Sequence, residues 1–376
     1  MTAKTCNIKG VTLSDIHLGH RRTPTEFIAR NLEKMVFTRN YADLDVIFIS
    51  GDLFDRTLPL SSDDSFESIQ WLGRLINFGK ANKIVVRLLE GTPSHEWKQT
   101  RILAAINEIA GGDCDVKWVS TLSIEHHAKL GVSILYIPDE WSPDPDDTWK
   151  QVQALLASEQ MTSVDFTIMH GQFPYQLPAH VKAPTHVPER YQSITNYLCF
   201  CGHVHTHSVL GNIVVPGSFD RLVHGEEGPK GFVEWTVRSK DNWDVSFVEN
   251  KGAKRYVNID VKGQSHEEML LTIDARIAEL PDESHIRLET FKSDPIAAVL
   301  QTVRVNYPQF VWSTPKLVDS GTDVAEPIMD RRMKLETVPI NPRTLPDLVK
   351  NELVARSVDS TTAEFCLHLI REALPK

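Results

Sequence analysis

The stretch V-I-F-I-S-G-D-L-F-D, residues 46–55, joins an apolar run to an acidic turn. Its first four residues are β-branched or aromatic, and such residues favour a strand. Gly51 and Asp52 follow at once, and a Gly-Asp pair is typical of a turn. The stretch therefore predicts a strand that carries a carboxylate at its end.

Runs of the same kind recur from residue 8 to about residue 250, each followed by a polar loop and often by a helix. Thr23, Pro24 and Glu26 predict the start of the first helix through a capping box with proline at the first helical position. Ser62 precedes a second helix with apolar residues at helical spacing. This alternation is typical of an α/β fold. The runs expected as strands are residues 8–13, 46–49, 84–89, 132–137, 166–169, 197–200 and 213–215.

Past residue 251 the pattern restarts and predicts a small separate α/β domain. Its expected elements are a strand at 256–261, a helix at 266–280, a strand at 286–291, a helix at 295–305 and a strand at 310–312. Two short helices follow, at 345–356 and 362–374. We expect a main domain at 1–251, a smaller capping domain at 252–335 and a C-terminal helical segment at 336–376.

The composition excludes several classes of protein. The 376 residues contain no apolar run of about 18 residues and begin without the apolar stretch of a signal peptide, so we expect a cytoplasmic protein. The five cysteines include no C-x-x-C pair, which argues against a disulfide framework and a zinc knuckle. The net charge of −10 means that a DNA-binding role needs bound metals, a local basic groove or a partner, because Lys and Arg supply most non-specific affinity for phosphates.

Five short motifs rich in Asp and His each follow an apolar run. The strands of an open α/β sheet present their ligand sites at one edge, so we expect these side chains to meet there. Each motif alone is a weak signal, because a lone D-x-H or H-x-H is commonly an exposed turn. The motifs are S-D-I-H at 14–17, G-D-L-F-D at 51–55, S-H-E at 94–96, M-H-G at 169–171 and G-H-V-H at 202–205.

Carboxylate and imidazole ligands together suit Mn²⁺, Fe²⁺ or Zn²⁺. A carboxylate shared between two ions can hold them about 3.5 to 4 Å apart, where they clamp a phosphoryl group and generate hydroxide near neutral pH. The motifs therefore predict a two-metal site that hydrolyses phosphate esters.

As an ordered series, the motifs resemble the calcineurin-like metallophosphoesterase superfamily, whose pattern is D-x-H, G-D-x-x-D, G-N-H-D/E, H and G-H-x-H. The resemblance covers roughly residues 8 to 220 and implies a four-layer α-β-β-α sandwich. It implies two divalent metal ions, with Mn²⁺ expected. Substrate is not decided by the fold alone, because the superfamily hydrolyses many phosphate esters.

The resemblance also assigns roles position by position. It implies a first metal site of Asp15, His17 and His205, a second of Ser94, His170 and His203, and Asp52 as the bridge between them. His95 matches the family's non-ligand histidine, which stabilises the transition state or protonates the leaving oxygen, and Glu96 would orient it. Ser94 stands where the family has asparagine, and we therefore expect the second site to be the weaker one.

Within the superfamily, the chain is most similar to the SbcD/Mre-type DNA repair nuclease subunit. The resemblance rests on G-D-L-F-D, on P-G-S-F-D-R at 216–221 followed by G-P-K-G-F at 228–232, and on the small domain beginning near residue 252. It implies a capping domain that contacts DNA and a C-terminal helical segment that docks on an SbcC/Rad-type coiled-coil ATPase subunit. The expected partners are DNA, this ATPase and a second copy of the chain, without a membrane. The chain is compact for the family, as phage-encoded versions are, and such a version would work in the host cytoplasm.

Alternatives stay open at this stage. His20, Arg21 and Arg22 follow the first motif and are candidates for contact with DNA phosphates, although solvated side chains are an equal reading. The acidic charge favours a small-molecule phosphodiesterase or a phosphatase. A catalytically weakened scaffold for an ATPase partner is a third reading, because Ser94 departs from the family pattern.

Overall fold

The computed structural model describes residues 7–38, 43–139, 142, 144–178, 180–319 and 349–350. The chain divides into two compact units, Met1–Leu317 and Val318–Lys376. Of the second unit only 318–319 and 349–350 are described, so the C-terminal helices and the ATPase-docking segment that the sequence predicts lie almost wholly outside the described residues. In the described ranges no helix is long and apolar enough to cross a membrane.

The first unit contains two six-stranded mixed sheets, which confirms the predicted α/β class. In the first sheet the strands that begin at Ile8, Val46 and Val85 run parallel to one another, as the apolar runs predict. The returning strand at 231–239 pairs antiparallel with the first. The strand order is β12 (Asn242–Glu249), β11 (Gly231–Ser239), β1 (Ile8–Leu13), β2 (Val46–Ser50), β3 (Val85–Leu89) and β4 (Val116–Val119).

The second sheet is built around four parallel strands, of which two end in the later motifs M-H-G and G-H-V-H. Cys199 and Cys201 are fully buried on one of them, as their alternate spacing predicts. The strand order is β5 (Ser123–His127), β6 (Val132–Ile137), β7 (Phe166–His170), β8 (Cys199–Gly202), β10 (Ile213–Val215) and β9 (Ser208–Leu210).

The two sheets pack face to face through aromatic side chains. Phe166 of β7 lies 5.9 Å from Phe48 of β2 and 5.1 Å from Trp235 of β11, measured between ring centroids. All three residues are buried, and burying rings of this size contributes strongly to stability. These rings therefore form part of the contact between the two sheets.

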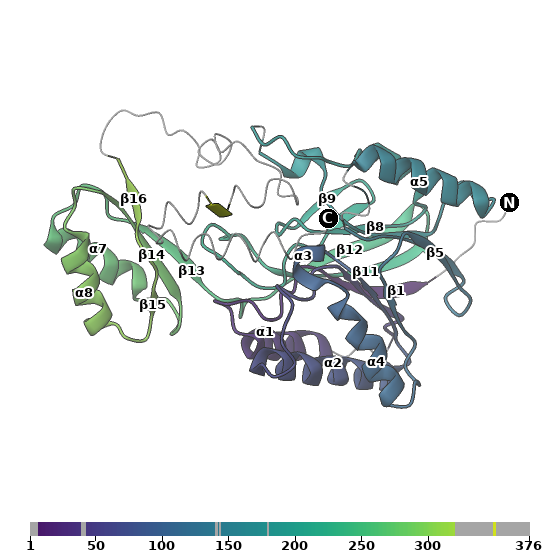
Figure 1. The fold of residues 1–376 in the computed structure, drawn as a ribbon, viewed down its shortest axis with the longest axis horizontal. Helices are drawn as coiled ribbons and strands as arrows, with labels where there is room; N and C mark the ends of the chain where they lie inside the picture. The colour runs from purple at the N-terminus through teal and green to yellow at the C-terminus, as the bar shows by residue number, and fades with distance from the viewer. Residues whose placement is uncertain are drawn as a thin grey trace. The chain divides into compact units, whose positions relative to one another are not determined.

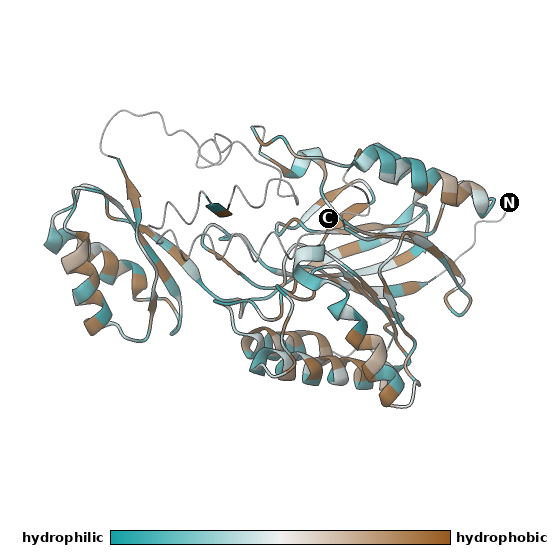
Figure 2. Ribbon diagram, viewed as in Figure 1, coloured by the Kyte–Doolittle hydropathy of each residue, from teal (hydrophilic) through white to brown (hydrophobic). Residues whose placement is uncertain are grey.

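Helices cover the outer faces of both sheets (Figure 1). They alternate between hydrophobic and hydrophilic residues, as helices with one covered face do (Figure 2). The first sheet carries α1 (Thr25–Leu32), α2 (Asp63–Asn82) and α4 (Ile102–Ile109), and the second carries α5 (Pro145–Ser158) and α6 (Pro188–Ile194). Short turns of helix lie at Glu33–Phe37, Gln99–Arg101 and Pro174–Gln176.

The two predicted helix starts have different outcomes. Ser62 caps α2 by accepting a hydrogen bond from the Ser65 amide, as expected. The capping box predicted for Thr23 and Glu26 is wrong, because α1 begins without a side-chain cap. The buried Thr23 hydroxyl instead donates to the carbonyl of Arg221, so a tertiary contact replaces the local one.

The smaller α/β region past residue 251 has the predicted elements and its own core. Its sheet joins β13 (Tyr256–Asp260), β14 (His285–Phe291) and β15 (Val311–Trp312), with β16 (Lys316–Val318) also paired to β14. The helices α7 (His266–Ile277) and α8 (Ile296–Asn306) supply Ile273 and Val299 to the core. The domain boundaries at residues 251 and 335 stay predictions.

Candidate metal centre

The ends of β1, β2, β7 and β8 bring the Asp and His motifs to one place, as the strand-end rule predicts. Asp15 and Asp52 follow neighbouring parallel strands, and the amide of Asp15 donates to the carbonyl of Gly51. His170 ends β7, and its Nδ1 donates to the carbonyl of Ser50 at the end of β2. That hydrogen bond joins the two sheets directly at the site.

Asp15, His17 and His205 form one group whose ligand atoms lie within 4.8 Å of one another. The Nε2 atoms of His17 and His205 are 3.2 Å apart, and Nε2 of His205 lies 3.8 Å from Oδ1 of Asp15. A carboxylate and two imidazoles that converge in this way can hold a divalent ion.

Asp52, His170 and His203 form a second such group. Nε2 of His170 lies 3.4 Å from Oδ1 of Asp52. The Nδ1 atom of His203 is buried and has no hydrogen-bond partner among the described residues. Burying such a nitrogen costs free energy unless a metal ion binds to it. Oδ2 of Asp52 lies 3.8 Å from Nε2 of His17, so one carboxylate lies between the two groups.

Outer hydrogen bonds leave the Nε2 atoms of His170 and His205 facing the site, whereas the buried Nδ1 of His17 has no hydrogen-bond partner among the described residues. The carbonyl of Ser50 accepts from Nδ1 of His170, Glu226 Oε1 lies 2.5 Å from Nδ1 of His205, and Asp55 Oδ1 lies 3.3 Å from Nδ1 of His17. Such partners fix the tautomer and ring orientation of metal-binding histidines. The donor set therefore fits divalent metal ions.

The backbone at the site is strained. Four of the grouped residues have left-handed φ values that non-glycine residues rarely adopt. Strain of this kind persists where surrounding structure imposes it, and it concentrates at functional sites. The residues are Asp15 (φ 48°), His17 (φ 54°), Asp52 (φ 49°) and His203 (φ 99°).

Two glycines allow the close packing around Asp52. Gly51 has φ +92°, and a Cβ atom there would lie 2.1 Å from Nδ1 of His170. A Cβ atom on Gly91 would lie 2.3 Å from Oδ1 of Asp52. Any larger residue at either position would displace a grouped side chain.

The charges at the centre favour a cation. Burial raises the pKa of Asp52, but His170, His95 and His17 outweigh it and hold that pKa well below its ordinary value. Burial lowers the pKa of His170, but the Asp52 carboxylate raises it well above its ordinary value. Since metal ligands bind in their deprotonated forms, a divalent ion here competes with protons.

The S-H-E motif lies on α3 (Pro93–Glu96) and only partly behaves as predicted. His95 Nδ1 lies 3.0 Å from Oδ2 of Asp52. Glu96 does not orient His95: its buried carboxylate accepts hydrogen bonds from the amides of Gly91 and Phe54, because both loops present amides that need acceptors. Burial and the nearby Asp52 raise the pKa of Glu96 to about 8.

Ser94 is exposed, and the hydroxyl that reaches the centre belongs to Thr92. Thr92 Oγ1 lies 3.2 Å from Oδ2 of Asp52 and 3.0 Å from Oδ2 of Asp139. A hydroxyl has only one proton and cannot donate fully to two carboxylates. The excess negative charge at this point is a further reason to expect a cation.

Asp139 is the acidic residue at the centre that the motifs do not predict. It follows β6, so a sixth strand end contributes a carboxylate, and Oδ2 lies 3.8 Å from Nδ1 of His203. The strand-end rule also applies to P-D-E at 138–140, which directly follows the apolar run at 132–137. Together with His186 and His203 it lines a cavity of about 380 Å³ that gives access to the second group.

The three residues predicted to touch DNA lie just after the first motif. His20 Nδ1 accepts hydrogen bonds from the amides of Arg22 and Thr23, which holds its ring, and burial lowers its pKa. Arg21 and Arg22 are exposed. Their contact with DNA stays a prediction.

Comparison with known proteins gives structural neighbours only. No family model matches the chain, and no curated protein matches it. One similar solved structure is 12% identical with a TM-score of 0.37 and aligns 64% of this chain with 99% of its own. The crystal structure of TT1561 of Thermus thermophilus is also 12% identical, with a TM-score of 0.35, and aligns 64% of this chain with 98% of its own.

Proposed function

We propose that this chain is a metal-dependent phosphodiesterase that holds two divalent ions, Mn²⁺ by preference, and hydrolyses phosphodiester bonds in DNA. The observation that carries the proposal is the position of Asp52, whose carboxylate lies 3.4 Å from His170 and 3.8 Å from His17, in different ligand groups. One carboxylate between two imidazole-rich groups is the arrangement that a two-metal phosphoryl site requires.

The candidate ligands fall into two sets that share Asp52. The first ion would be held by Asp15, His17 and His205, and the second by His170, His203 and Asp139, with Asp52 shared. Bound ions of this kind polarise the phosphoryl group and supply hydroxide near neutral pH. Thr92 contacts the Asp52 and Asp139 carboxylates through its hydroxyl, and its backbone amide donates to Asp52 Oδ1.

His95 is the candidate for handling the proton of the leaving oxygen. Its Nδ1 is bound to Asp52 and its side chain is 34% exposed, so it is held firmly but open to a bound substrate. A histidine placed in this way can donate a proton to the departing alkoxide. His95 also lies close enough to His17 and Asp52 to form a third ligand group, so its role needs a direct test.

The choice of DNA rests on the resemblance of the motifs to the SbcD/Mre-type nuclease. On the same basis we propose the four-layer metallophosphoesterase sandwich, with DNA, an SbcC/Rad-type coiled-coil ATPase and a second copy of the chain as partners. Packing of helices on the outer faces of two apposed sheets supports the fold proposal. The net charge of −10 favours a second candidate, a small-molecule phosphodiesterase or phosphatase.

One assay separates these candidates. Linear duplex DNA, bis(p-nitrophenyl) phosphate and p-nitrophenyl phosphate are each incubated with the protein in Mn²⁺ and in excess chelator. We expect degradation of DNA that requires Mn²⁺ and is lost in Asp52→Asn, which removes the shared negative charge at constant size. Hydrolysis of only the small esters would support the second candidate, and activity in chelator would exclude the metal mechanism.

A further inference from the structure

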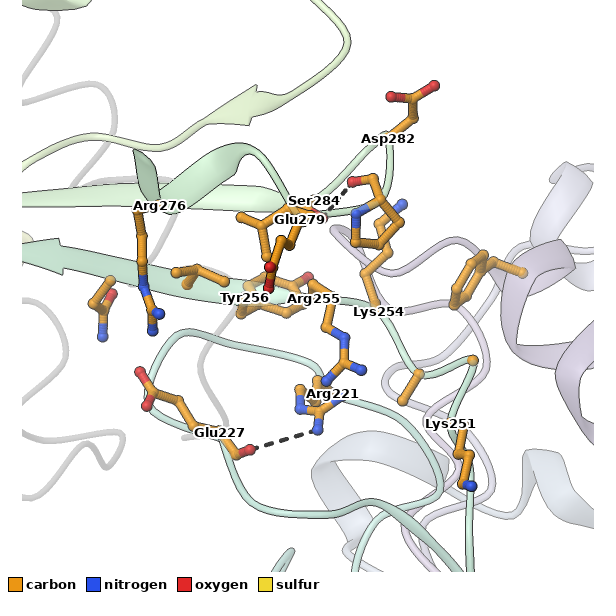
Figure 3. A pocket seen from close by; sticks show the side chains of 17 residues that line it. Arg221, Glu227, Lys251, Lys254, Arg255, Tyr256, Arg276, Glu279, Asp282 and Ser284 are labelled. Carbon is orange, nitrogen blue, oxygen red and sulfur yellow. Dashed lines mark hydrogen bonds between the residues drawn. The ribbon is translucent and has the colours of Figure 1, made fainter. Parts of the chain in front are cut away.

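A second cavity, of about 630 Å³, lies where the main domain meets the smaller α/β region (Figure 3). Five basic residues line it against three acidic ones, although the chain as a whole has a net charge of −10. The basic residues are Arg221, Lys251, Lys254, Arg255 and Arg276. The cavity is therefore more basic than the chain as a whole.

Arg221 has a buried guanidinium group, and one of its donor nitrogens lacks a hydrogen-bond partner among the described residues. Its residue is only 4% exposed, and its Nη2 donates to the carbonyl of Gly228 at 3.0 Å. Its Nη1 is buried and has no hydrogen-bond partner among the described residues. Burying a charged donor without a partner is costly, so the position favours an anion supplied from outside.

Arg255 adds a second guanidinium beside the first. Figure 3 shows the two groups close together, and burial together with Arg255 lowers the pKa of Arg221. Arg255 forms no ion pair with any residue that the structure describes, whereas Lys254 is paired with Glu283 at 2.9 Å. The Asp282 carboxylate points away from the two guanidinium groups in Figure 3. Two adjacent guanidinium groups, one of which has a donor nitrogen without a hydrogen-bond partner, match the geometry of a phosphate.

We propose that this cavity binds the phosphate group of a nucleotide, either a free mononucleotide or a residue of a DNA strand, through Arg221 and Arg255. The volume exceeds what a phosphate alone needs and lies in the range of small-molecule sites, about 300 to 1,000 Å³, so it accepts the attached sugar and base. Asn258 and Ser284 line the cavity and offer polar contacts. The choice of a nucleotide as the phosphate carrier rests on the proposed function.

The cavity is linked to the metal centre through a short loop. Leu222, which follows Arg221 in the chain, donates its amide to Oε2 of Glu226. Oε1 of the same Glu226 contacts Nδ1 of His205. Glu226 thus connects the residue that follows Arg221 with a histidine of the first ligand group.

The test measures binding without catalysis. In excess chelator, inorganic phosphate, 5′-dAMP and one short oligonucleotide with or without a 5′-phosphate are titrated into the full chain. Arg255→Gln is the informative variant, because Arg255 is only half-buried and its loss should not unfold the protein. Arg304→Gln, at an exposed position of α8 outside the cavity, is the matched control. Arg221→Lys, which keeps the positive charge but removes the paired donors of the guanidinium group, is the second variant.

We expect 5′-dAMP or the oligonucleotide to bind, and Arg255→Gln to weaken that binding about tenfold or more, the scale of one charge-assisted hydrogen bond. Arg304→Gln should bind as the wild type does. Tighter binding of the 5′-phosphorylated strand would show that the cavity takes a terminal phosphate. If Arg255→Gln weakens the binding of both strands equally, the cavity takes an internal phosphate. Binding of 5′-dAMP but of neither strand would show that it takes a free nucleotide.

Absence of nucleotide binding by the wild type, or equal binding by wild type and Arg255→Gln, would overturn the proposal. Because no metal is present, the result does not depend on hydrolysis. A protein that binds nucleotides in this way but never cleaves DNA in Mn²⁺ would contradict only the proposed function.

Discussion

Oδ2 of Asp139 lies 3.8 Å from Nδ1 of His203, a buried nitrogen with no hydrogen-bond partner among the described residues. Metal–ligand bonds from His and Asp are about 2.0 to 2.2 Å long, so one ion between these atoms can bind both. Asp139 is therefore our choice for the ligand that completes the second group.

Replacing Asp139 with alanine should weaken the second Mn²⁺ ion about tenfold or more while leaving the first in place, because one charged oxygen is removed from one group only. Isothermal titration calorimetry with Mn²⁺ measures both sites. Asp241→Ala, at an exposed position outside both groups, is the control. Unchanged two-site binding in Asp139→Ala would exclude Asp139 as a ligand.

Thr92→Val should also weaken the second ion, because valine keeps the shape but removes the hydroxyl that contacts Asp52 and Asp139. Loss of such an outer contact costs about 10-fold to 100-fold in metal affinity. Ser94→Ala should bind Mn²⁺ as the wild type does, because Ser94 is exposed. The opposite pattern, with Ser94→Ala defective and Thr92→Val normal, would restore Ser94 as the ligand.

His95→Ala should lower the rate of DNA hydrolysis by about 100-fold or more while Mn²⁺ binding stays nearly intact, since help from a general acid is of this size. Rates and calorimetry are measured on the same preparation. His126→Ala, at an exposed histidine on β5, is the control. Loss of an ion from His95→Ala would show that His95 is a ligand.

Asp220 should give the protein a measurable dependence of stability on pH. Burial raises the pKa of Asp220 from an ordinary 3.8 to about 6. Between these pH values the folded chain keeps a proton that the unfolded chain has released, so the free energy of unfolding falls as pH rises. The shift corresponds to about 3 kcal/mol at most, fully present below pH 3.8 and lost above pH 6.

Urea denaturation of the wild type and of Asp220→Asn at several pH values tests this. The asparagine cannot titrate, so the stability of the wild type relative to the variant should decrease between pH 4 and pH 6. A difference that stays constant across this range would show that Asp220 ionises normally in the folded protein.

The sequence predicts much of the centre because strand-end positions depend on a local pattern. Asp15, Asp52 and His170 each follow a run of buried β-branched or aromatic residues, and parallel strands carry them to one edge. Capping is less certain from sequence, since the Thr23 hydroxyl had an equally good partner 198 residues away at Arg221. Phe66, one of the apolar residues at helical spacing after Ser62, is 61% exposed.

The remaining contacts depend on tertiary structure. Glu226 reaches His205 across 21 residues of chain, and no spacing in the motif indicates it. Thr92 rather than Ser94 contacts Asp52, because α3 begins at Pro93 and leaves Ser94 exposed. The spacing of the motif points to Ser94, the residue next to His95 in sequence, and does not indicate Thr92.

Diffraction from crystals soaked in Mn²⁺, with anomalous data collected at the manganese edge, tests the central claim most directly. We predict two anomalous peaks about 3.5 to 4 Å apart, one on each side of the Asp52 carboxylate. The first should be bound by Asp15, His17 and His205, and the second by Asp139, His170 and His203. A single peak, or two peaks that do not share Asp52, would contradict the two-metal account.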